Sequence, residues 1–124
     1  MILLAAASLA VQQAAPAANW RELGTHDDGM AFAYDRASLR LDPARSVALV
    51  AFRSVRPGGS HAVSEVEIRC ATNEARVMTT RNYAANGTPG MVDTVPVELQ
   101  AIPPGSYFEL VRTEVCPAPA GPEA

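Results

Sequence analysis

Residues 63–72 read Val-Ser-Glu-Val-Glu-Ile-Arg-Cys-Ala-Thr, and their side chains alternate between two kinds. The small or apolar side chains share one face: Ser64, Val66, Ile68 and Cys70. The charged side chains share the other face: Glu65, Glu67 and Arg69. A period of two predicts a β-strand with one buried face. We therefore expect Cys70 to point into the core, and the segment that carries Cys116 to cover the same face.

A second strand is predicted at Val47–Phe52, the most apolar stretch after the N-terminal segment. Both of its faces are apolar, which is typical of a central strand in a sheet. One helix covers only one face, so the other face is left with alternate residues of this strand: Val47, Leu49 and Ala51, or else Ala48, Val50 and Phe52. Such an apolar strip indicates either an interface or partial cover by loops. The first alternative predicts a homodimer through the uncovered sheet face.

Further strands are separated by turn signals rich in Asp, Asn, Pro and Gly. The additional expected strands are 20–24, 30–34, 39–41 and 75–83. The expected turns are 27–29, 35–38, 42–45, 72–74 and 86–90, with a longer glycine-rich loop at 56–61. The first two strands are expected to form a hairpin around Asp27-Asp28-Gly29.

The C-terminal third predicts a helix. Ser106-Tyr-Phe-Glu109 has the pattern of a capping box, with Ser106 as the N-cap and Glu109 at the third helical position. Apolar side chains then recur at helical spacing up to Val115, and Pro117 ends the helix just after Cys116. Together with the strands, this predicts an α+β fold. We expect an antiparallel sheet of about six strands with one C-terminal helix packed on one face and stapled to it by a disulfide.

The N-terminus predicts export. Residues 2–11 are apolar and uncharged, a run too short for a membrane span of about 20 residues but typical of a signal peptide. Ala15-Pro16-Ala17 offers small residues for cleavage, so we expect a signal peptide at 1–17 and a folded domain at 18–116. Residues 117–124, rich in proline and alanine, are expected to form a disordered tail.

Export bears on the two cysteines, Cys70 and Cys116. Disulfides persist in exported proteins, and two cysteines allow one pairing within the chain. That bond would close a loop of about 46 residues and contribute about 4 kcal/mol on the chain-entropy model. Two free thiols are the alternative.

Composition excludes several classes of protein. Hydrophobic residues make up 48% of the 124 residues and charged residues 19%, which excludes a disordered polyelectrolyte. The net charge of -3 argues against a nucleic-acid partner, since nucleic-acid binders need a basic field. The sequence holds no cofactor fingerprint, no serine-nucleophile motif and no metal-ligand spacing. We therefore expect no enzyme activity, no cofactor and no metal.

Three groups of residues are candidate sites. His26-Asp27-Asp28 could hold a metal, but its place in a hairpin favours a turn. Glu65 and Glu67, roughly 7 Å apart along a strand, could serve glycoside hydrolysis, but Arg69 on the same face favours surface ion pairs. A binding loop is the third candidate, with a plain flexible hairpin as its alternative. Its residues are Arg56, Pro57, Gly58, Gly59, Ser60 and His61.

The order of these landmarks resembles the surface-adhesin protein E family of bacterial envelope proteins. The residues that carry the resemblance are Trp20-Arg-Glu-Leu-Gly24, Asp27-Asp-Gly29, Phe32-Ala-Tyr-Asp35 with Ser38, Val47–Phe52, Glu67-Ile-Arg-Cys70, Arg76, Tyr83, Gly87, Ile102-Pro-Pro-Gly-Ser106 and Val115-Cys116. They cover nearly all of the chain after residue 17. The resemblance implies a small antiparallel sheet with a C-terminal helix tied to it by a disulfide.

The resemblance also implies a function. The founding adhesin binds extracellular-matrix and plasma proteins at the cell surface and can dimerise. We therefore expect an exported, non-catalytic protein-binding module that serves adhesion or envelope contacts. The alternative is a small periplasmic inhibitor or envelope-stress factor that acts on a hydrolase through the 56–61 loop. The chain has neither lysine nor a lipoprotein cysteine. A periplasmic or extracellular protein, with or without outer-membrane association, is accordingly favoured over a displayed adhesin.

Overall fold

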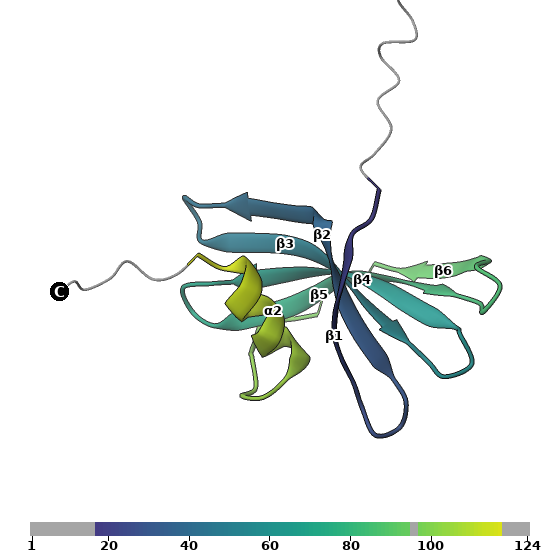
Figure 1. Ribbon diagram of the computed structural model, residues 1–124. Coiled ribbons are helices and arrows are strands. Elements are labelled where there is room, and N and C mark those ends of the chain that lie inside the picture. Colours follow the sequence, from purple (N-terminus) through teal and green to yellow (C-terminus); the bar gives the residue numbers. More distant parts are fainter. Residues whose placement is uncertain (1–16, 95–96, 118–124) are drawn as a thin grey trace, which may run out of the picture.

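The computed structural model describes residues 17–94 and 97–117, which form an antiparallel sheet with a helix on one face (Figure 1). The elements are β1 (Trp20–Thr25), β2 (Ala31–Asp42), β3 (Val47–Val55), β4 (His61–Arg69), β5 (Glu74–Tyr83), β6 (Pro89–Asp93), β7 (Gln100–Ala101) and α2 (Tyr107–Val115). This is the predicted α+β fold. The predicted signal peptide and tail lie outside the described residues, apart from Ala17 and Pro117.

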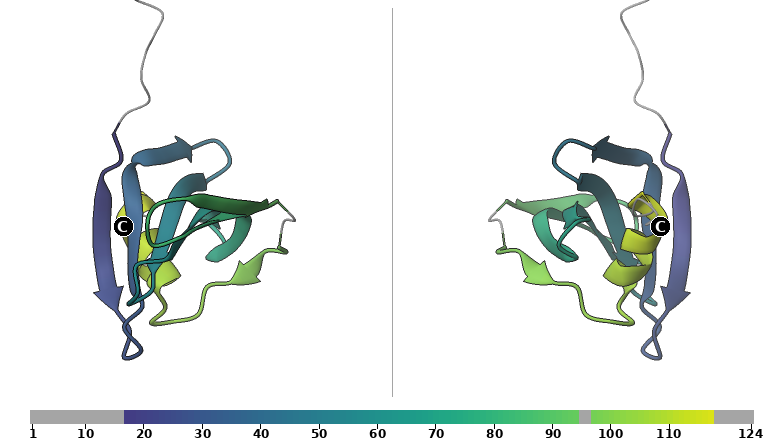
Figure 2. Two further views of the ribbon diagram at one scale, coloured as in Figure 1. Left: turned by 90° about the vertical axis from the view of Figure 1, so that its right-hand side faces the viewer. Right: turned by 90° about the vertical axis from the view of Figure 1, so that its left-hand side faces the viewer.

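The strands lie in the sheet in chain order from β1 to β6, and β7 pairs with a separate part of β5. Figure 2 shows a strong twist, because the strands at the two edges run in clearly different directions. β3 lies in the interior of the sheet, as the apolar run at 47–52 predicted, and β4 lies beside it in the interior.

The core lies between α2 and one face of the sheet. Ile68 pairs with Ala48 on one side and with Ala75 on the other, and all three side chains are buried. Val111 and Val115 of α2 belong to the same cluster. Rings extend the cluster toward the start of the helix, where the centroids of Phe52 and Phe108 lie 4.9 Å apart. The even-numbered residues of Val47–Phe52 therefore face the helix, and the odd-numbered ones face away.

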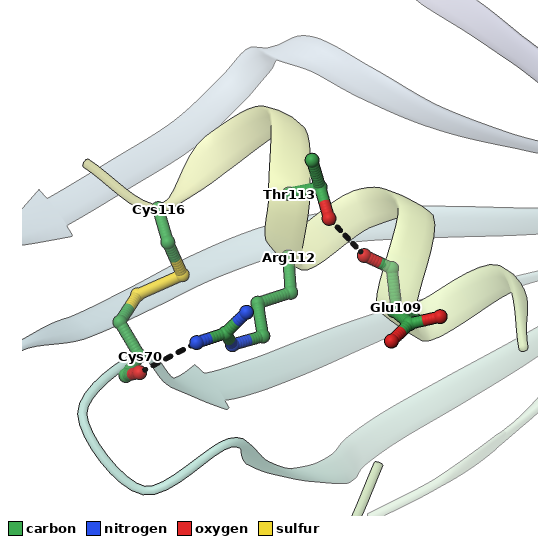
Figure 3. The surroundings of a disulfide bond; sticks show 5 residues. All are labelled: Cys70, Glu109, Arg112, Thr113 and Cys116. Atoms are coloured by element: carbon green, nitrogen blue, oxygen red, sulfur yellow. Dashed lines mark hydrogen bonds between the residues drawn. A yellow bond between two sulfur atoms is a disulfide. The ribbon is translucent and has the colours of Figure 1, made fainter. Parts of the chain in front are cut away.

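The helix begins and ends where the sequence predicted. The Ser106 hydroxyl accepts the Glu109 backbone N–H at 3.2 Å, and the Glu109 carboxylate accepts the Gly105 N–H at 2.7 Å. The C-cap is Cys116, whose N–H donates to the Arg112 carbonyl. Figure 3 shows the disulfide between Cys116 and Cys70, with Cα atoms 5.8 Å apart. Cys70 thus contributes to the helix-covered side, as the strand alternation predicted.

A second connection holds the helix to the edge of the sheet. The Tyr34 hydroxyl donates to Glu114 at 2.8 Å, and Arg21 of β1 donates to both oxygens of the same carboxylate. The hydrogen bonds from Arg21 and Tyr34 lower the pKa of Glu114, although burial opposes them. Burial and the bond to Glu114 raise the pKa of Tyr34. The helix is therefore held to the sheet at one point by the disulfide and at another by the Arg21–Glu114 ion pair.

The turn predicted at 35–38 is wrong, because β2 continues through it as a bulge. Between the pairs Asp35–Ala51 and Arg40–Leu49, four residues of β2 lie opposite one residue of β3. The Ser38 hydroxyl accepts the Ala51 N–H at 2.8 Å and so replaces the missing strand partner. Asp35 accepts the backbone N–H groups of Asn19 and Ala37. Turn-type hydrogen bonds here bend a strand instead of ending it.

Several strand boundaries also differ from the prediction. β4 begins at His61 and ends at Arg69, and the chain then turns at residues 70–73. The strands β6 and β7 were not predicted. Both depend on pairing with β5, the first at Thr80–Tyr83 and the second at Glu74 and Ala75. Their own sequences are short and exposed, so they carry little periodic signal.

Candidate functional site

Three hairpin turns of the same construction lie at one end of the sheet. They are residues 26–30, 56–60 and 84–88, here called the turn platform. In each, the first residue donates its N–H to the carbonyl of the fifth, and the fourth, a glycine, donates back to the first. These glycines, Gly29, Gly59 and Gly87, have φ of 88°, 99° and 91°, a region that favours glycine. A three-residue loop with left-handed glycine is a common way to join two strands tightly.

The three turns of the platform touch one another in sequence. A Cβ added to Gly29 would lie 2.7 Å from Pro57, and one added to Gly59 would lie 3.3 Å from Ala85. The middle turn is therefore held between its two neighbours. In Figure 1 these turns follow one another around one end of the twisted sheet. Gly58 has no other atom within 4 Å of its virtual Cβ, so the tip of the middle turn is open.

Aromatic rings pack against the two histidines that lie at or next to the platform turns. The His61 ring stacks on Tyr83, with centroids 4.8 Å apart and planes 8° apart. His26 contacts two rings edge-on, Phe32 at 5.4 Å and Tyr107 at 5.1 Å. Both histidines of the chain thus lie at the platform end of the sheet, each against a tyrosine. Tyr107 is the first residue of α2, so the helix also braces the platform.

The predicted binding loop, Arg56, Pro57, Gly58, Gly59, Ser60 and His61, is the middle turn together with the first residue of β4. Its ends are joined by backbone hydrogen bonds, and a neighbouring turn lies on each side of it. His61 is half-buried in the stack on Tyr83. Asp27 and Asp28 lie in the first turn, and the Asp28 carboxylate accepts the Met30 N–H at 2.9 Å. The turn interpretation of this segment is therefore confirmed.

Sequence reasoning missed the platform as a unit. The sequence predicts the turn at 84–88 two residues later, at 86–90, and does not indicate that it lies beside the 56–60 turn. A signal was nevertheless present. Each of the three segments carries glycine at its fourth position, in Asp27-Asp-Gly29, Pro57-Gly-Gly59 and Ala85-Asn-Gly87. Because alternate hairpins of a meander turn at the same end of the sheet, this repeated pattern could have grouped them.

The face of the sheet away from α2, here called the open face, carries charged pairs. Glu65 of β4 forms a surface ion pair, but its partner is Arg40 of β2 at 3.1 Å, whereas the sequence indicated Arg69. Glu67 is different, because it is buried, with 4% of its surface exposed. Its two oxygens accept the Nε–H groups of Arg69 and Arg76, the second at 2.8 Å. Burial alone would raise the pKa of Glu67, but the two arginines outweigh it and lower that pKa.

The apolar strip predicted on the open face is mostly covered. Val47 is buried, while Leu49 and Ala51 are half-buried among the long charged side chains. The exposed large apolar side chains lie elsewhere: Leu41, Met91, Val92, Val97 and Leu110. The homodimer prediction therefore loses the exposed strip on which it was based.

Other classes of site find little support in the described residues. No group of three or more His, Cys, Asp and Glu side chains there could hold a metal ion. Within residues 17–94 and 97–117, no helix has the length and hydropathy that a membrane crossing requires. Comparison of the chain with protein-family models, with curated proteins and with solved structures finds no match.

Proposed function

We propose that the chain is an exported, non-catalytic protein-binding module that resembles surface-adhesin protein E, and that it binds through the turn platform. The observation that carries this proposal is the packing of three like turns into one surface at one end of the sheet. Recognition residues are commonly found on loops that a rigid scaffold positions. The pairing of both cysteines supports export, because disulfides persist outside the reducing cytosol.

The platform offers contacts without large ordering costs. Each turn is fixed by two backbone hydrogen bonds, so little loop entropy remains to be lost on binding. Its exposed residues include an acidic pair, Asp27 and Asp28, and a basic residue, Arg56, on neighbouring turns. A mixed-charge surface of this kind favours a polar protein partner over a polyanion.

The proposal is tested by placing a side chain at the open tip. Gly58→Glu adds bulk and charge where the backbone has room for both. Ala44→Glu is its matched control, because Ala44 is exposed in the turn at the opposite end of the sheet. We expect the unchanged chain and the control to bind at least one protein of a panel of immobilised extracellular-matrix and plasma proteins, measured by surface plasmon resonance. Gly58→Glu should weaken that binding about tenfold or more. No saturable binding, or equal binding by both variants, would contradict the proposal.

The alternative function, inhibition of a periplasmic hydrolase, is tested in an activity assay with the same Gly58→Glu variant. It requires the 56–61 loop to enter a cleft, whereas the platform places a turn on each side of that loop. A broad contact surface fits this arrangement better than an inserted loop does. If envelope hydrolases lose activity in the presence of the unchanged chain but not of Gly58→Glu, the inhibitor function replaces adhesion.

Export is tested separately. Mass spectrometry of the protein recovered from the periplasm or medium should show a chain that begins after Ala17. Its mass without reduction should be that of the disulfide form. An intact N-terminus on a cytosolic protein would overturn the exported part of the proposal and leave the binding part to its own test.

A further inference from the structure

The open face holds a pair of arginine side chains fixed by one buried carboxylate. Glu67 is the only charged residue among the buried residues of the described chain, although it lies on the face without a helix. Arg69 lies two residues further along β4, and Arg76 lies directly opposite Glu67 on β5. Each arginine gives its Nε–H to a different oxygen of Glu67. The two guanidinium groups therefore flank one carboxylate and lie on the same small area of the sheet.

Both arginines have N–H donors that Glu67 does not use. A guanidinium has five N–H donors, of which Nε–H is one and the two η nitrogens carry four. In the described part of the chain, no hydrogen bond uses the η nitrogens of Arg69 or Arg76. Their side chains remain 34% and 30% exposed, so these nitrogens are open to solvent. The bonds to Glu67 already restrict the side chains of Arg69 and Arg76, which lowers the conformational entropy that they would lose on binding a ligand.

The unused donors favour an anion. The two guanidinium groups are balanced by Glu67 and by Glu74, which lies opposite Arg69, so these four side chains carry no net formal charge. The free η N–H donors, rather than an excess of charge, therefore provide the attraction. Other pairs on this face are already balanced, since Arg40 is paired with Glu65, and Arg53 with Glu22. Glu74 accepts the Thr72 hydroxyl at 2.8 Å and so has a hydrogen-bond partner of its own. A ligand that accepts several hydrogen bonds at once would use the η nitrogens of both arginines.

We propose that Arg69 and Arg76, positioned by Glu67, form a binding site for a tetrahedral oxyanion, either phosphate or sulfate. Arginine forks match the oxygen spacing of such anions and bind them through paired, charge-assisted hydrogen bonds. The anion is either free or part of a larger molecule, and the chemistry of the two is the same. The site lies on the open face and not on the turn platform, so it stands or falls independently of the proposed function.

The experiment follows the arginine Nε–H signals of the isotope-labelled chain by NMR. Inorganic phosphate and inorganic sulfate are added while sodium chloride is withdrawn, so that ionic strength stays constant. We expect saturable shifts of the Arg69 and Arg76 signals. Arg40 lies on the same face but is paired with Glu65, so its signal should not shift. A sulfated disaccharide in a parallel titration distinguishes the sources. Tighter binding than that of sulfate assigns the site to a carried anion, and equal binding assigns it to the free ion.

Conservative variants separate binding from structure. Arg76→Lys keeps the charge beside Glu67 but removes the fork, and we expect the affinity for sulfate to fall about tenfold. Arg40→Lys is the matched control and should bind sulfate as the unchanged chain does. Arg69→Lys provides the same test if Arg76→Lys fails to fold, as judged by circular dichroism. Shifts of equal size at every arginine, or full affinity in the lysine variants, would show an ordinary structural ion pair and overturn the site.

Discussion

The two faces of the sheet are stabilised in different ways. The helix-covered face is apolar, and its central residues Val50, Val66 and Ile68 are at most 1% exposed. The open face uses ion pairs, and one of its buried side chains, Glu67, is charged. Both faces belong to the same strands, because neighbouring residues of a strand point to opposite sides. A substitution can therefore test one face while it leaves the other in place.

This difference predicts different responses to solvent conditions. Apolar burial does not depend on pH or on moderate salt, whereas the carboxylates of ion pairs must stay ionised. Paired charges on an exposed surface contribute little, but a buried pair that loses one partner is costly. Stability should therefore come mainly from the covered face, and its variation with pH from Glu67 and Glu114.

The largest effect is expected from the disulfide that closes the covered face. Replacing both Cys70 and Cys116 by alanine should lower the free energy of unfolding by about 4 kcal/mol on the chain-entropy model. For a domain of this size the thermal midpoint should then fall by roughly 15 °C or more. Thermal unfolding followed by circular dichroism, with and without reductant, measures it. An unchanged midpoint on reduction would mean that the bond adds nothing to the fold.

The next effect compares core residues with their neighbours across the sheet. Ile68→Ala removes a fully buried side chain and should cost about 3 kcal/mol. Leu49→Ala, on the open face, should lower the free energy of unfolding by less than half as much. Leu49 is only half-buried, so its truncation removes less buried apolar surface. Urea denaturation of the two variants gives both values. Equal losses would show that the open face is packed as tightly as the covered one.

Acid should act on two ion-paired carboxylates, Glu67 on the open face and Glu114 of α2. The folded pKa of Glu67 is lowered, so its contribution to stability is present above the unfolded pKa of about 4.3 and is lost as pH falls through the folded value. Glu114 has a lowered pKa too and adds in the same direction. Glu67→Gln should therefore flatten the loss of stability below about pH 4.3 without abolishing it.

Urea midpoints measured between neutral pH and pH 3 test this, with Glu65→Gln as the control. Glu65 lies on the same strand face, but 43% of its side chain is exposed, so its removal should alter the acid response little. A steeper acid loss in Glu67→Gln than in the unchanged chain would refute the role given to the Glu67 carboxylate.

Local signals explain which parts of the fold could be predicted. The capping box at Ser106 and the alternation that orients Cys70 act within a few residues, and both are found as predicted. β6 and β7 exist only through pairing with β5, so their own residues do not predict them. The platform likewise depends on contacts between turns far apart in the chain, such as Gly29 with Pro57. Pairings of this kind are set by the whole sheet.

The bulge in β2 shows how a local signal can mislead. Asp35 and Ser38 have the side chains that start turns, and they make the short-range hydrogen bonds expected of a turn. The strand nevertheless continues, because Ser38 also accepts the Ala51 N–H from β3. Only the neighbouring strand decides between a turn and a bulge at this position. The sequence alone therefore contained the right residues but not the partner that fixes their role.

The smallest effect should come from this bulge. Ser38→Ala removes the acceptor of the Ala51 N–H and should cost about 1 kcal/mol, because that donor loses its partner in a partly buried place. Ser60→Ala is the control, since the Ser60 side chain makes no hydrogen bond within the described residues, and it should change stability by less than half as much. Amide hydrogen exchange adds a local readout. Ala51 should exchange faster in Ser38→Ala, while Val66, on the next strand and in the shared core, should keep its protection. If Ala51 exchanges at its original rate, water satisfies its N–H as well as the hydroxyl does, and Ser38 does not hold the bulge.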